Sequence, residues 1–164
     1  MIFCQGFAAR ANPWFGGLPF DGAKGEILTL RIPGLTERRV IHRGIWLAPL
    51  GGELFRAGAT YDRENLNDNP TPRAIEEIRH QLQSFLRLPF EVVEHHAAVR
   101  PIVMGRHPVI GLHPRFPQLG CFNGLASKGT LQAPFIASQF ADFLQGQGEI
   151  GDSLSLQKRF GPVL

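Results

Sequence analysis

Residues 39–57, RVIHRGIWLAPLGGELFRA, decide the fold class of this chain. The segments Arg39–Leu47 and Glu53–Ala57 are rich in apolar and β-branched residues, and each is predicted to form a β-strand. Gly51 and Gly52 lie between them, and paired glycines reach the positive φ angles of a hairpin turn at little steric cost. An antiparallel pair of strands is therefore expected here.

Further extended segments lie on both sides of this hairpin. Glu26–Arg31 (EILTLR) and Leu88–Val103 are predicted to be extended, and Ile2–Cys4 and Cys121–Phe122 are predicted to be short buried strands. No G-x-G-x-x-G follows any of these strands, so a complete Rossmann unit is absent from the sequence. The strands favour a mixed, largely antiparallel sheet.

Two main helices accompany the strands. Thr71 is a suitable N-cap and is followed by proline at the first helical position. The apolar residues of this first helix recur at helical spacing and predict one buried face: Ile75, Ile78, Leu82 and Phe85. A second helix is predicted over Ala133–Gln145, because Pro134 is expected to delay its start. The fold class is therefore α+β.

Composition excludes several classes of protein. The 164 residues suffice for one ordinary domain, and a hydrophobic content of 43% argues against disorder. No stretch approaches the ~20 apolar residues that cross a bilayer. The arginines are scattered and form no basic block, so a nucleic-acid partner is not expected despite the net charge of +3.

The cysteines and histidines give no metal site. Cys4 and Cys121 are far apart in the sequence and each lies in an apolar run, so both thiols are expected to be buried. Such cysteine usage favours a reducing, cytoplasmic compartment without a disulfide framework. The histidines show only loose spacing, whereas a zinc site needs clustered ligands.

Arg100 is the first candidate for a functional residue. Pro101 favours extended geometry at Arg100 and removes a backbone donor from the next position, so Arg100 is expected at a strand end. A guanidinium there can hold a carboxylate by two parallel hydrogen bonds. From spacing alone, an arginine in a structural ion pair is the more frequent alternative.

Residues 124–130, GLASKGT, are the second candidate. These small residues follow a buried strand and precede a helix. A loop in this place presents backbone N–H groups, and the helix presents the positive end of its dipole, to an anionic partner. The alternative is a tight β-to-α connection whose glycines serve only sterics, with Ser127 and Thr130 as caps. Considered as an isolated loop, this alternative is the stronger one.

Taken together, five segments resemble the D-amino-acid oxidase / glycine oxidase (DAO) family of flavoproteins. The segments occur in the family's order over almost the whole chain: Ile2–Gly6, Lys24–Leu28, Gly51–Thr60, Val99–Gly111 and Gly124–Pro134. They resemble, in turn, the family's closing strand of the dinucleotide domain, its P-x-x-G-x-x-L entry, its hairpin, its G-x-R-P segment and its last glycine-rich segment. The resemblance raises both candidate sites above their structural alternatives.

The resemblance implies an FAD-dependent enzyme that oxidises a small amine or amino acid by hydride transfer to the flavin. Arg100 would anchor the substrate carboxylate, and Trp46 is a candidate wall of the substrate pocket, although core packing is the more frequent role of such a residue. The cofactor-binding residues implied by the resemblance are Gly6, Gly124, Leu125, Ala126, Ser127, Lys128, Gly129 and Thr130.

The chain departs from the family pattern at positions that bear on substrate identity and on the local flavin contacts. Leu125 replaces the family's usual His, and Arg106 stands near the position of its usual Asp. The nucleotide-binding half is missing, so residues 1–8 are expected to be a remnant strand of that half. Residues 9–148 are expected to form the substrate domain and residues 149–164 a tail.

One main functional expectation and two alternatives to it remain open at this point. The chain is expected to be the inactive substrate-binding part of an FAD-dependent amine oxidoreductase, which needs the missing half or a partner subunit. A non-catalytic assembly module or a subunit of a split flavoenzyme, pairing with itself or with a partner through an apolar surface, is the first alternative. The oxidase part of a tRNA wobble-uridine modification enzyme is the second.

Overall fold

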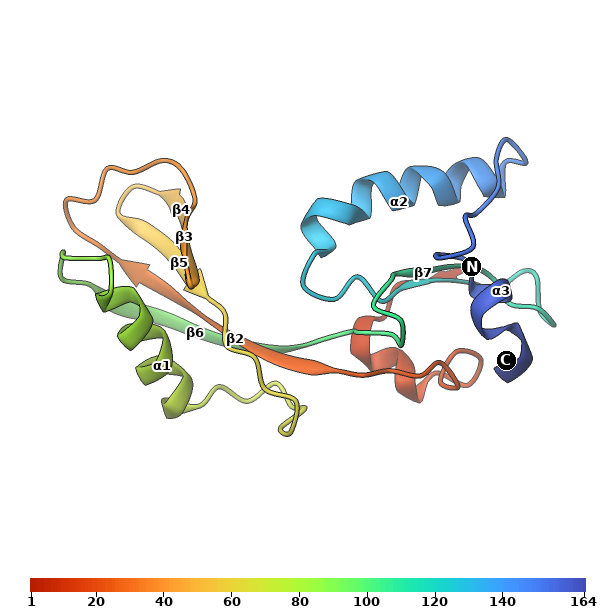
Figure 1. Ribbon diagram of the computed structural model, residues 1–164, viewed down its shortest axis with the longest axis horizontal. Coiled ribbons are helices and arrows are strands. Elements are labelled where there is room, and N and C mark those ends of the chain that lie inside the picture. Colours follow the sequence, from red (N-terminus) through yellow and green to blue (C-terminus); the bar gives the residue numbers. More distant parts are fainter. The chain divides into compact units, whose positions relative to one another are not determined.

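The computed structural model describes residues 1–164, apart from the side chain of Val163. The chain divides into two compact units, one of Met1–Gly22 with Arg100–Leu164 and one of Ala23–Val99. Each unit has its own sheet (Figure 1) and its own hydrophobic core. The expected divisions at residues 8 and 148 do not coincide with the limits of these units, and the domain roles attached to them stay predictions.

The second unit contains a five-stranded sheet with the strand order β3-β4-β5-β2-β6. Its strands are β2 (Ala23–Arg31), β3 (Ile41–Arg43), β4 (Ile45–Gly51), β5 (Leu54–Gly58) and β6 (Glu91–Arg100), the last of which runs one residue into the first unit. The pairs β3–β4, β4–β5 and β2–β5 are antiparallel. The mixed, largely antiparallel α+β class is thus confirmed.

Glycines occupy the turn between β3 and β4 and the turn between β4 and β5. The prediction of one strand over Arg39–Leu47 is wrong, because Gly44 has φ +73° and the chain reverses there, so that Arg43 pairs with Ile45. The predicted hairpin turn is confirmed, since Gly51 and Gly52 have φ +115° and +57°. Positive φ is accessible to glycine because it carries no Cβ.

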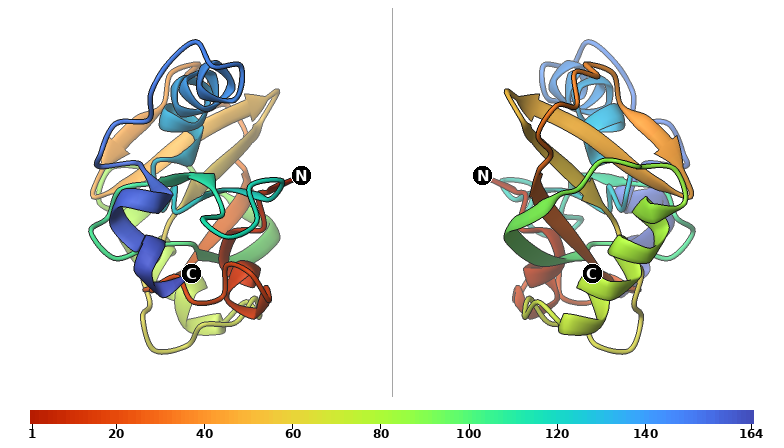
Figure 2. Two further views of the ribbon diagram at one scale, coloured as in Figure 1. Left: turned by 90° about the vertical axis from the view of Figure 1, so that its right-hand side faces the viewer. Right: turned by 90° about the vertical axis from the view of Figure 1, so that its left-hand side faces the viewer.

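Helix α1 (Pro72–Gln83) covers one face of the five-stranded sheet (Figures 1 and 2). The predicted cap is confirmed, because the Thr71 hydroxyl accepts a hydrogen bond from the backbone N–H of Ala74. Ile78 and Leu82 are buried against the apolar side chains of β2, β4 and β5. Burial of such side chains stabilises each by roughly 1.5–3 kcal/mol relative to exposure.

A buried charged network joins α1 to β2 and β6. Lys24 is 1% and Glu26 is 4% exposed, and their Nζ and Oε1 atoms lie 3.4 Å apart. Glu26 also accepts hydrogen bonds from the backbone N–H (2.7 Å) and hydroxyl (2.9 Å) of Thr71, and His95 Nε2 lies 2.9 Å from Glu26 Oε2. Lys24 Nζ donates to Asn67 Oδ1 at 3.1 Å. The Glu26 carboxylate therefore contacts the cap of α1 and a residue of β6, and through Lys24 it is linked to the loop that contains Asn67.

The first unit contains a three-stranded sheet with the order β1-β8-β7, in which β1 and β8 are parallel and β7 and β8 antiparallel. Its elements are β1 (Ile2–Phe3), η1 (Gly6–Ala11), β7 (Val109–Leu112), β8 (Gly120–Asn123), α2 (Gly129–Leu144), α3 (Leu156–Phe160) and η2 (Gly161–Val163). Ile136 and Phe140 of α2 pack on Ile110 of β7, which places this helix on the sheet.

The expected start of the second helix at Ala133 is wrong, because α2 begins at Gly129 with Pro134 inside it. The backbone N–H groups of Leu131 and Gln132 both donate to the carbonyl of Lys128, at 3.1 and 3.0 Å, so the first turn is already wound. Pro134 removes one donor near the start of the helix, and the favourable burial of Ile136 and Phe140 outweighs this loss.

The C-terminal tail is not a plain polar extension. Leu156 is fully buried, and Ile110 pairs with Ser155 in an isolated β-bridge. The guanidinium of Arg159 donates to the carbonyls of Met104 (2.7 Å) and Pro108 (2.8 Å), which holds α3 against the loop before β7. The tail therefore belongs to the core of the first unit.

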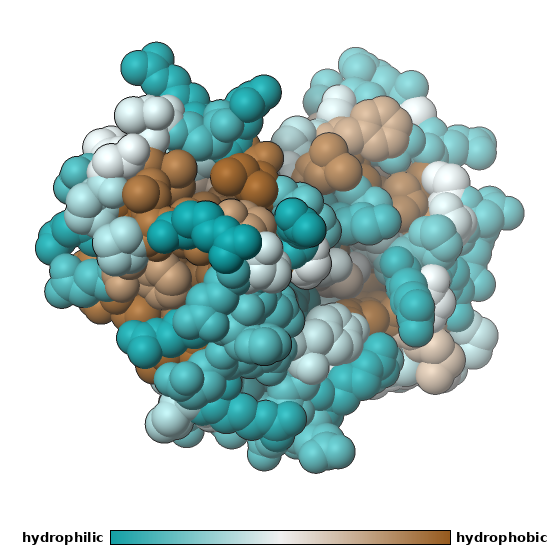
Figure 3. All heavy atoms as spheres, turned by 60° about the vertical axis from the view of Figure 1, so that its left-hand side comes forward, coloured by the Kyte–Doolittle hydropathy of each residue, from teal (hydrophilic) through white to brown (hydrophobic). Residues whose placement is uncertain are grey.

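The face shown in Figure 3 is mainly hydrophilic, with apolar areas between the hydrophilic ones. Leu131 and Phe135 of α2 are 79% and 68% exposed. Cys121 is buried as expected, but the expected burial of Cys4 is wrong, because this thiol is exposed. Among the described residues, no helix has both the length and the apolar character that crossing a membrane requires.

The buried network makes Glu26 a test of the fold. We expect Glu26→Gln to lower the free energy of unfolding by about 3–5 kcal/mol, because it removes the charged partner that lies 3.4 Å from the buried Lys24 ammonium. Urea denaturation followed by circular dichroism measures this change. The matched control is Glu91→Gln, which removes an exposed ion pair to Arg31 and should cost no more than about 1 kcal/mol. Equal costs would contradict the assigned role of the network.

The same pair of variants gives a pH dependence. Burial favours a higher pKa for the Glu26 carboxyl, but the donors of Thr71 and the charge of Lys24 outweigh it and lower the pKa below 4.5. A carboxyl with a lowered folded-state pKa stabilises the fold above its unfolded-state pKa, and this stability is lost as the pH falls through the folded-state value. The wild-type chain should therefore lose more stability below pH 4.5 than Glu26→Gln does.

Candidate functional site

The first unit brings three of the predicted segments together. Gly6 begins η1, Arg100 ends β6, and residues 124–130 comprise the connection from β8 to α2 and the first two residues of that helix. The backbone N–H of Ala126 donates to the carbonyl of Pro101 at 3.2 Å, so the glycine-rich loop is joined directly to the Arg100–Pro101 segment. A Cβ placed on Gly6 would lie 4.0 Å from Cγ of Pro101, so Gly6 is a neighbour of the same segment.

Asn123 holds this arrangement and was missed by sequence reasoning. Its side chain is 3% exposed, its Nδ2 donates to the carbonyl of Gly6 at 2.9 Å, and its Oδ1 accepts from the N–H of Gly124 at 2.8 Å. Asn at the end of a buried strand, directly before glycine, is the sequence signal that indicates such a residue, because the Asn side chain readily bonds neighbouring backbone groups.

Gly124 is required by both its conformation and its surroundings. Its φ is +77°, and a Cβ there would meet Val103 Cγ2 at 3.1 Å and the carbonyl oxygen of His107 at 3.4 Å. Ala126 also has a positive φ of +50°, which is uncommon for a residue with a side chain. The loop is therefore held in a specific conformation rather than being a loose connection.

Several N–H groups of this loop point to no protein acceptor. Among the described residues, Leu125, Ser127, Gly129 and Thr130 have backbone N–H groups without a protein hydrogen-bond acceptor, whereas Lys128 N–H donates to Leu125 at 3.1 Å. These donors lie at the N-terminus of the 16-residue helix α2, where the helix dipole is positive. The side chains of Ser127 and Lys128 are exposed. The loop can therefore donate hydrogen bonds to an electron-rich group.

Arg100 is placed as expected, at the last position of β6 and directly before Pro101. It is half-buried and makes interactions within the protein. Its backbone is thus fixed by the strand on one side and by the Pro101–Ala126 hydrogen bond on the other.

Trp46 lies in the second unit, on β4, where it pairs with Gly58 of β5. A Cβ on Gly58 would lie 3.0 Å from Cζ2 of Trp46 and 2.6 Å from Cγ2 of Ile27, so the absence of a side chain at Gly58 gives the indole ring its place. Trp46 is half-buried and is not part of the apolar core under α1.

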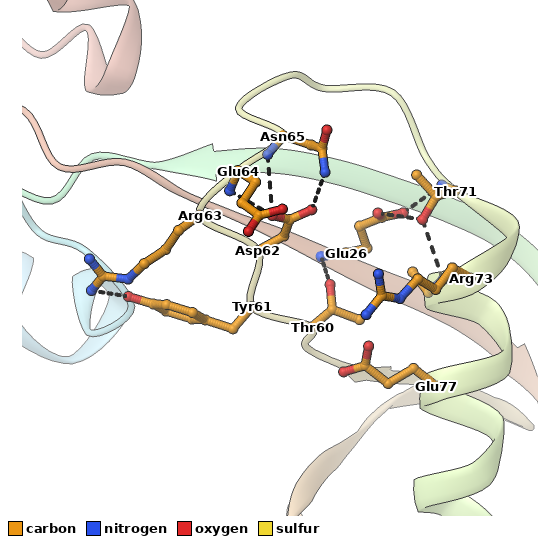
Figure 4. Close-up of a pocket in the computed structure, with 11 residues that line it drawn as sticks. Glu26, Thr60, Tyr61, Asp62, Arg63, Glu64, Asn65, Thr71, Arg73 and Glu77 are labelled. Atoms are coloured by element: carbon orange, nitrogen blue, oxygen red, sulfur yellow. Dashed lines mark hydrogen bonds between the residues drawn. The ribbon is translucent and has the colours of Figure 1, made fainter.

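A polar pocket of about 370 Å³ lies at the start of α1, within the second unit (Figure 4). None of the residues predicted from the sequence as site residues line it. Its lining residues are Glu26, Thr60, Tyr61, Asp62, Arg63, Glu64, Asn65, Thr71, Arg73, Ala74 and Glu77.

The polar groups of this pocket largely bind one another. Asp62 accepts from Asn65 Nδ2 at 2.9 Å and from the N–H of Glu64 at 2.7 Å, and Glu26 accepts from Thr71 (Figure 4). Among the described residues, no three His, Cys, Asp or Glu side chains gather so that they could hold a metal ion. The pocket therefore has a structural explanation, the capping of α1.

The chain's donors suit one part of a flavin cofactor. The four backbone N–H groups without protein acceptors, at the N-terminus of α2, fit the electron-rich edge of a flat ring system. The residues that would hold that edge are Leu125 to Thr130. The sequence offers no glycine motif for a pyrophosphate, so the fit is restricted to the ring.

Comparison with known proteins identifies the family to which the chain belongs. Residues 2–143 match the model of the family described as DAO, FAD dependent oxidoreductase.

Solved structures show the same fold. Glycine oxidase from Geobacillus kaustophilus superposes with a TM-score of 0.76 at 20% identity over 92% of this chain and 42% of that one. Iminodiacetate oxidase from Chelativorans sp. BNC1 gives 0.76 at 23% identity over 92% and 43%. Glycine oxidase from Bacillus cereus ATCC 14579 gives 0.74 at 20% identity over 90% and 42%. This chain thus spans less than half the length of each.

Gly124 provides the test of the close packing that holds this loop. We expect Gly124→Ala to lower the free energy of unfolding by about 2–5 kcal/mol, because positive φ costs roughly 1–2 kcal/mol for Ala and overpacking adds about 1–3 kcal/mol. Gly146→Ala is the matched control, since Gly146 has φ +71° but nothing within 4 Å of a built Cβ, and it should show only the first cost. Thermal and urea unfolding measure both. A Gly124 variant no less stable than the Gly146 variant would refute the close packing.

Proposed function

The chain belongs to the family of FAD-dependent oxidoreductases, and from this premise we propose that it forms the substrate-binding and flavin-contacting portion of an enzyme that oxidises an amine or amino acid. The observation that carries the proposal is the hydrogen bond of 3.2 Å from Ala126 N–H to the carbonyl of Pro101. This bond joins the Arg100–Pro101 segment, which carries a permanently charged guanidinium, to the loop whose backbone N–H groups can donate hydrogen bonds. The proposed substrate anchor and the proposed cofactor-binding loop are thus neighbours in space within the first unit.

Arg100 is proposed to bind the carboxylate of the substrate. A guanidinium is charged at every relevant pH and binds a carboxylate through two parallel hydrogen bonds, which fixes both position and orientation. The β6 strand and Pro101 hold the backbone of Arg100, so little conformational entropy is lost on binding. Orientation of the reacting C–H bond is the main contribution that such an anchor makes to catalysis.

The loop from Leu125 to Thr130 is proposed to stabilise negative charge at the edge of the flavin ring. When FAD is bound, it supplies the redox chemistry, accepting a hydride from the carbon that bears the amine. The N–H groups of Leu125, Ser127, Gly129 and Thr130 and the N-terminus of α2 are fixed before the reaction, so they need not reorganise as charge develops. Gly124 and Asn123 act by holding this loop in place.

The proposal includes a partner for this chain. The chain spans less than half the length of the similar structures and carries no dinucleotide motif, so we propose that a nucleotide-binding portion, in the same or another polypeptide, completes the enzyme. The exposed apolar residues Leu131 and Phe135 and the free edge of β1 support this interface, as they equally support self-association as an assembly module. A reducing, cytoplasmic location is proposed from the buried Cys121 thiol.

Arg100→Lys tests the substrate anchor in the flavin-loaded enzyme that contains this chain. We expect KM for amino-acid substrates to rise roughly ten- to hundredfold, because the two-pronged hydrogen bond is lost. Steady-state oxidation of an amino acid and of the corresponding amine without a carboxylate separates the effects, since only the former should change. Arg87→Lys, at an exposed loop position, is the control. Unchanged KM values would remove Arg100 from the site.

Flavin retention tests the incompleteness of the isolated chain. We expect the purified 164-residue chain to release FAD during gel filtration, because its donors serve only the ring and not the nucleotide. Absorbance at flavin wavelengths in the protein peak measures retention. A yellow protein with one flavin per chain would contradict this expectation.

A further inference from the structure

The guanidinium of Arg159 in α3 binds several main-chain carbonyls of one turn. Its Nη2 donates to the carbonyl of Met104 at 2.7 Å, and its Nη1 lies 3.3 Å and 2.8 Å from the carbonyl oxygens of His107 and Pro108. Nη1 also donates to the carbonyl of Ser153 at 3.0 Å. Among the residues that the structure describes, every acceptor of this guanidinium is a main-chain oxygen. A planar group with five donors can bind several such oxygens at once, whereas a lysine ammonium offers three donors from one point.

The turn to which three of these carbonyls belong, residues 103–108, has an uncommon backbone conformation. Gly105 and Arg106 have φ angles of +89° and +58°, and the second value is uncommon for a residue with a side chain. A Cβ on Gly105 would lie 3.3 Å from Arg159 Nη2, so the turn fits closely around the guanidinium. Carbonyl dipoles that point to one place repel one another unless a cation lies between them. Arg159 therefore stabilises this conformation of the 103–108 turn.

The 103–108 turn also forms the wall against which Gly124 packs. The carbonyl oxygen of His107, which Arg159 binds, lies 3.4 Å from the position of a Cβ on Gly124. Pro108 Cα lies 3.4 Å and Val103 Cγ2 lies 3.1 Å from the same position. A single carbonyl group thus separates the guanidinium from the glycine that begins residues 124–130. A displacement of the turn is therefore expected to move that loop.

Helix α3 is itself fixed to the sheet of the first unit. The N–H of Ile110 in β7 donates to the carbonyl of Leu154 at 2.9 Å, and Leu156 of α3 is fully buried. Arg159 is half-buried, and its guanidinium lies over the ring of Phe160 at 4.6 Å from the ring centroid. The guanidinium therefore acts on the turn from a rigid support.

We propose that Arg159 is a positioning residue of the flavin-contacting loop: it fixes the 103–108 turn, and this turn fixes Gly124 and the N–H donors of residues 125–130. This inference rests on the proposed function. Donors that stabilise developing charge act through preorganisation, and a functional site needs its groups held to within about 0.5 Å. Arg159 lies outside residues 2–143, which match the family model, so its assignment comes from the contacts of this chain.

The reduction potential of the bound flavin tests this role in the flavin-loaded enzyme that contains this chain. We expect Arg159→Gln to lower the potential, because displaced N–H donors stabilise the negatively charged, reduced flavin less well. A roughly tenfold loss of the preference for reduced over oxidised flavin corresponds to about 30 mV for a two-electron couple. A contribution to folding alone would leave the potential of the folded enzyme unchanged, and an unchanged potential would overturn the inference.

Arg159→Lys separates position from charge. It keeps the positive charge but loses the planar set of donors, so the potential should shift in the same direction by a smaller amount. A wild-type potential in Arg159→Lys would assign the effect to the charge alone and would overturn the positioning role. If Arg159→Gln does not fold, Arg159→Lys carries the test.

Lys158→Gln is the matched control. It removes one positive charge from the adjacent position of α3, but the Lys158 side chain is exposed and forms an ion pair with Asp152. The potential should stay at the wild-type value. A shift as large as that of Arg159→Gln would mean that any loss of charge from α3 has this effect, which contradicts a specific role of Arg159.

A second measurement needs no flavin. The N–H of Ala126 donates to the carbonyl of Pro101, and its hydrogen exchange is followed by NMR in the chain without cofactor. We expect this exchange to be roughly tenfold faster in Arg159→Gln than in the wild type and unchanged in Lys158→Gln. The amides of β5 in the second unit are the reference for global unfolding. Equal exchange of Ala126 in the wild type and in Arg159→Gln would overturn the inference and leave the proposed function intact.

Failure of the proposed function gives a different result. A complete enzyme that contains this chain and binds no flavin would refute the proposed function, together with any role of Arg159 toward the cofactor. The exchange of Ala126 then decides whether Arg159 positions residues 124–130. Faster exchange in Arg159→Gln supports that assignment, and equal exchange overturns it.

Discussion

The hydrogen bond from Ala126 N–H to the carbonyl of Pro101 is the constraint on which the functional account depends. It joins two segments that lie 25 residues apart in the sequence, one ending in a charged side chain and the other lined with backbone donors. Ala126 makes this bond with a positive φ of +50°, and the side chain of Asn123 accepts a hydrogen bond from the N–H of Gly124 in the same loop. Strain of this kind is characteristic of sites that hold a ligand.

The two units differ in the groups that they present: the first presents mainly backbone groups and the second mainly side chains. In the first, backbone groups are arranged by a short sheet and by α2, so small residues are needed wherever chain segments approach closely. In the second, a sheet with one face covered by α1 leaves its other face available to side chains such as Trp46 and Arg56. The buried network around Glu26 fixes α1 to that sheet, so the open face is carried by a rigid support.

Local sequence rules predicted most elements of this fold. Hydrophobic periodicity and the Thr71–Pro72 cap gave α1, and Gly51–Gly52 gave the hairpin, because both signals act within a few residues. These local rules failed where contacts between residues distant in the sequence determine the structure. Pro134 was expected to delay α2, but packing of Ile136 and Phe140 on the sheet winds the helix from Gly129. The hydrogen bond from the Asn123 side chain to the carbonyl of Gly6 joins residues 117 positions apart, and no rule based on sequence spacing predicts such a contact.

The account is tested most directly by a crystal structure of the flavin-loaded enzyme containing this chain, with a non-reacting carboxylate analogue of the substrate. It predicts the carboxylate within hydrogen-bond distance of the Arg100 guanidinium, at about 2.7–2.9 Å, and the N–H groups of residues 125–130 against the flavin ring. A carboxylate bound away from Arg100, or a flavin ring that does not touch this loop, would contradict it.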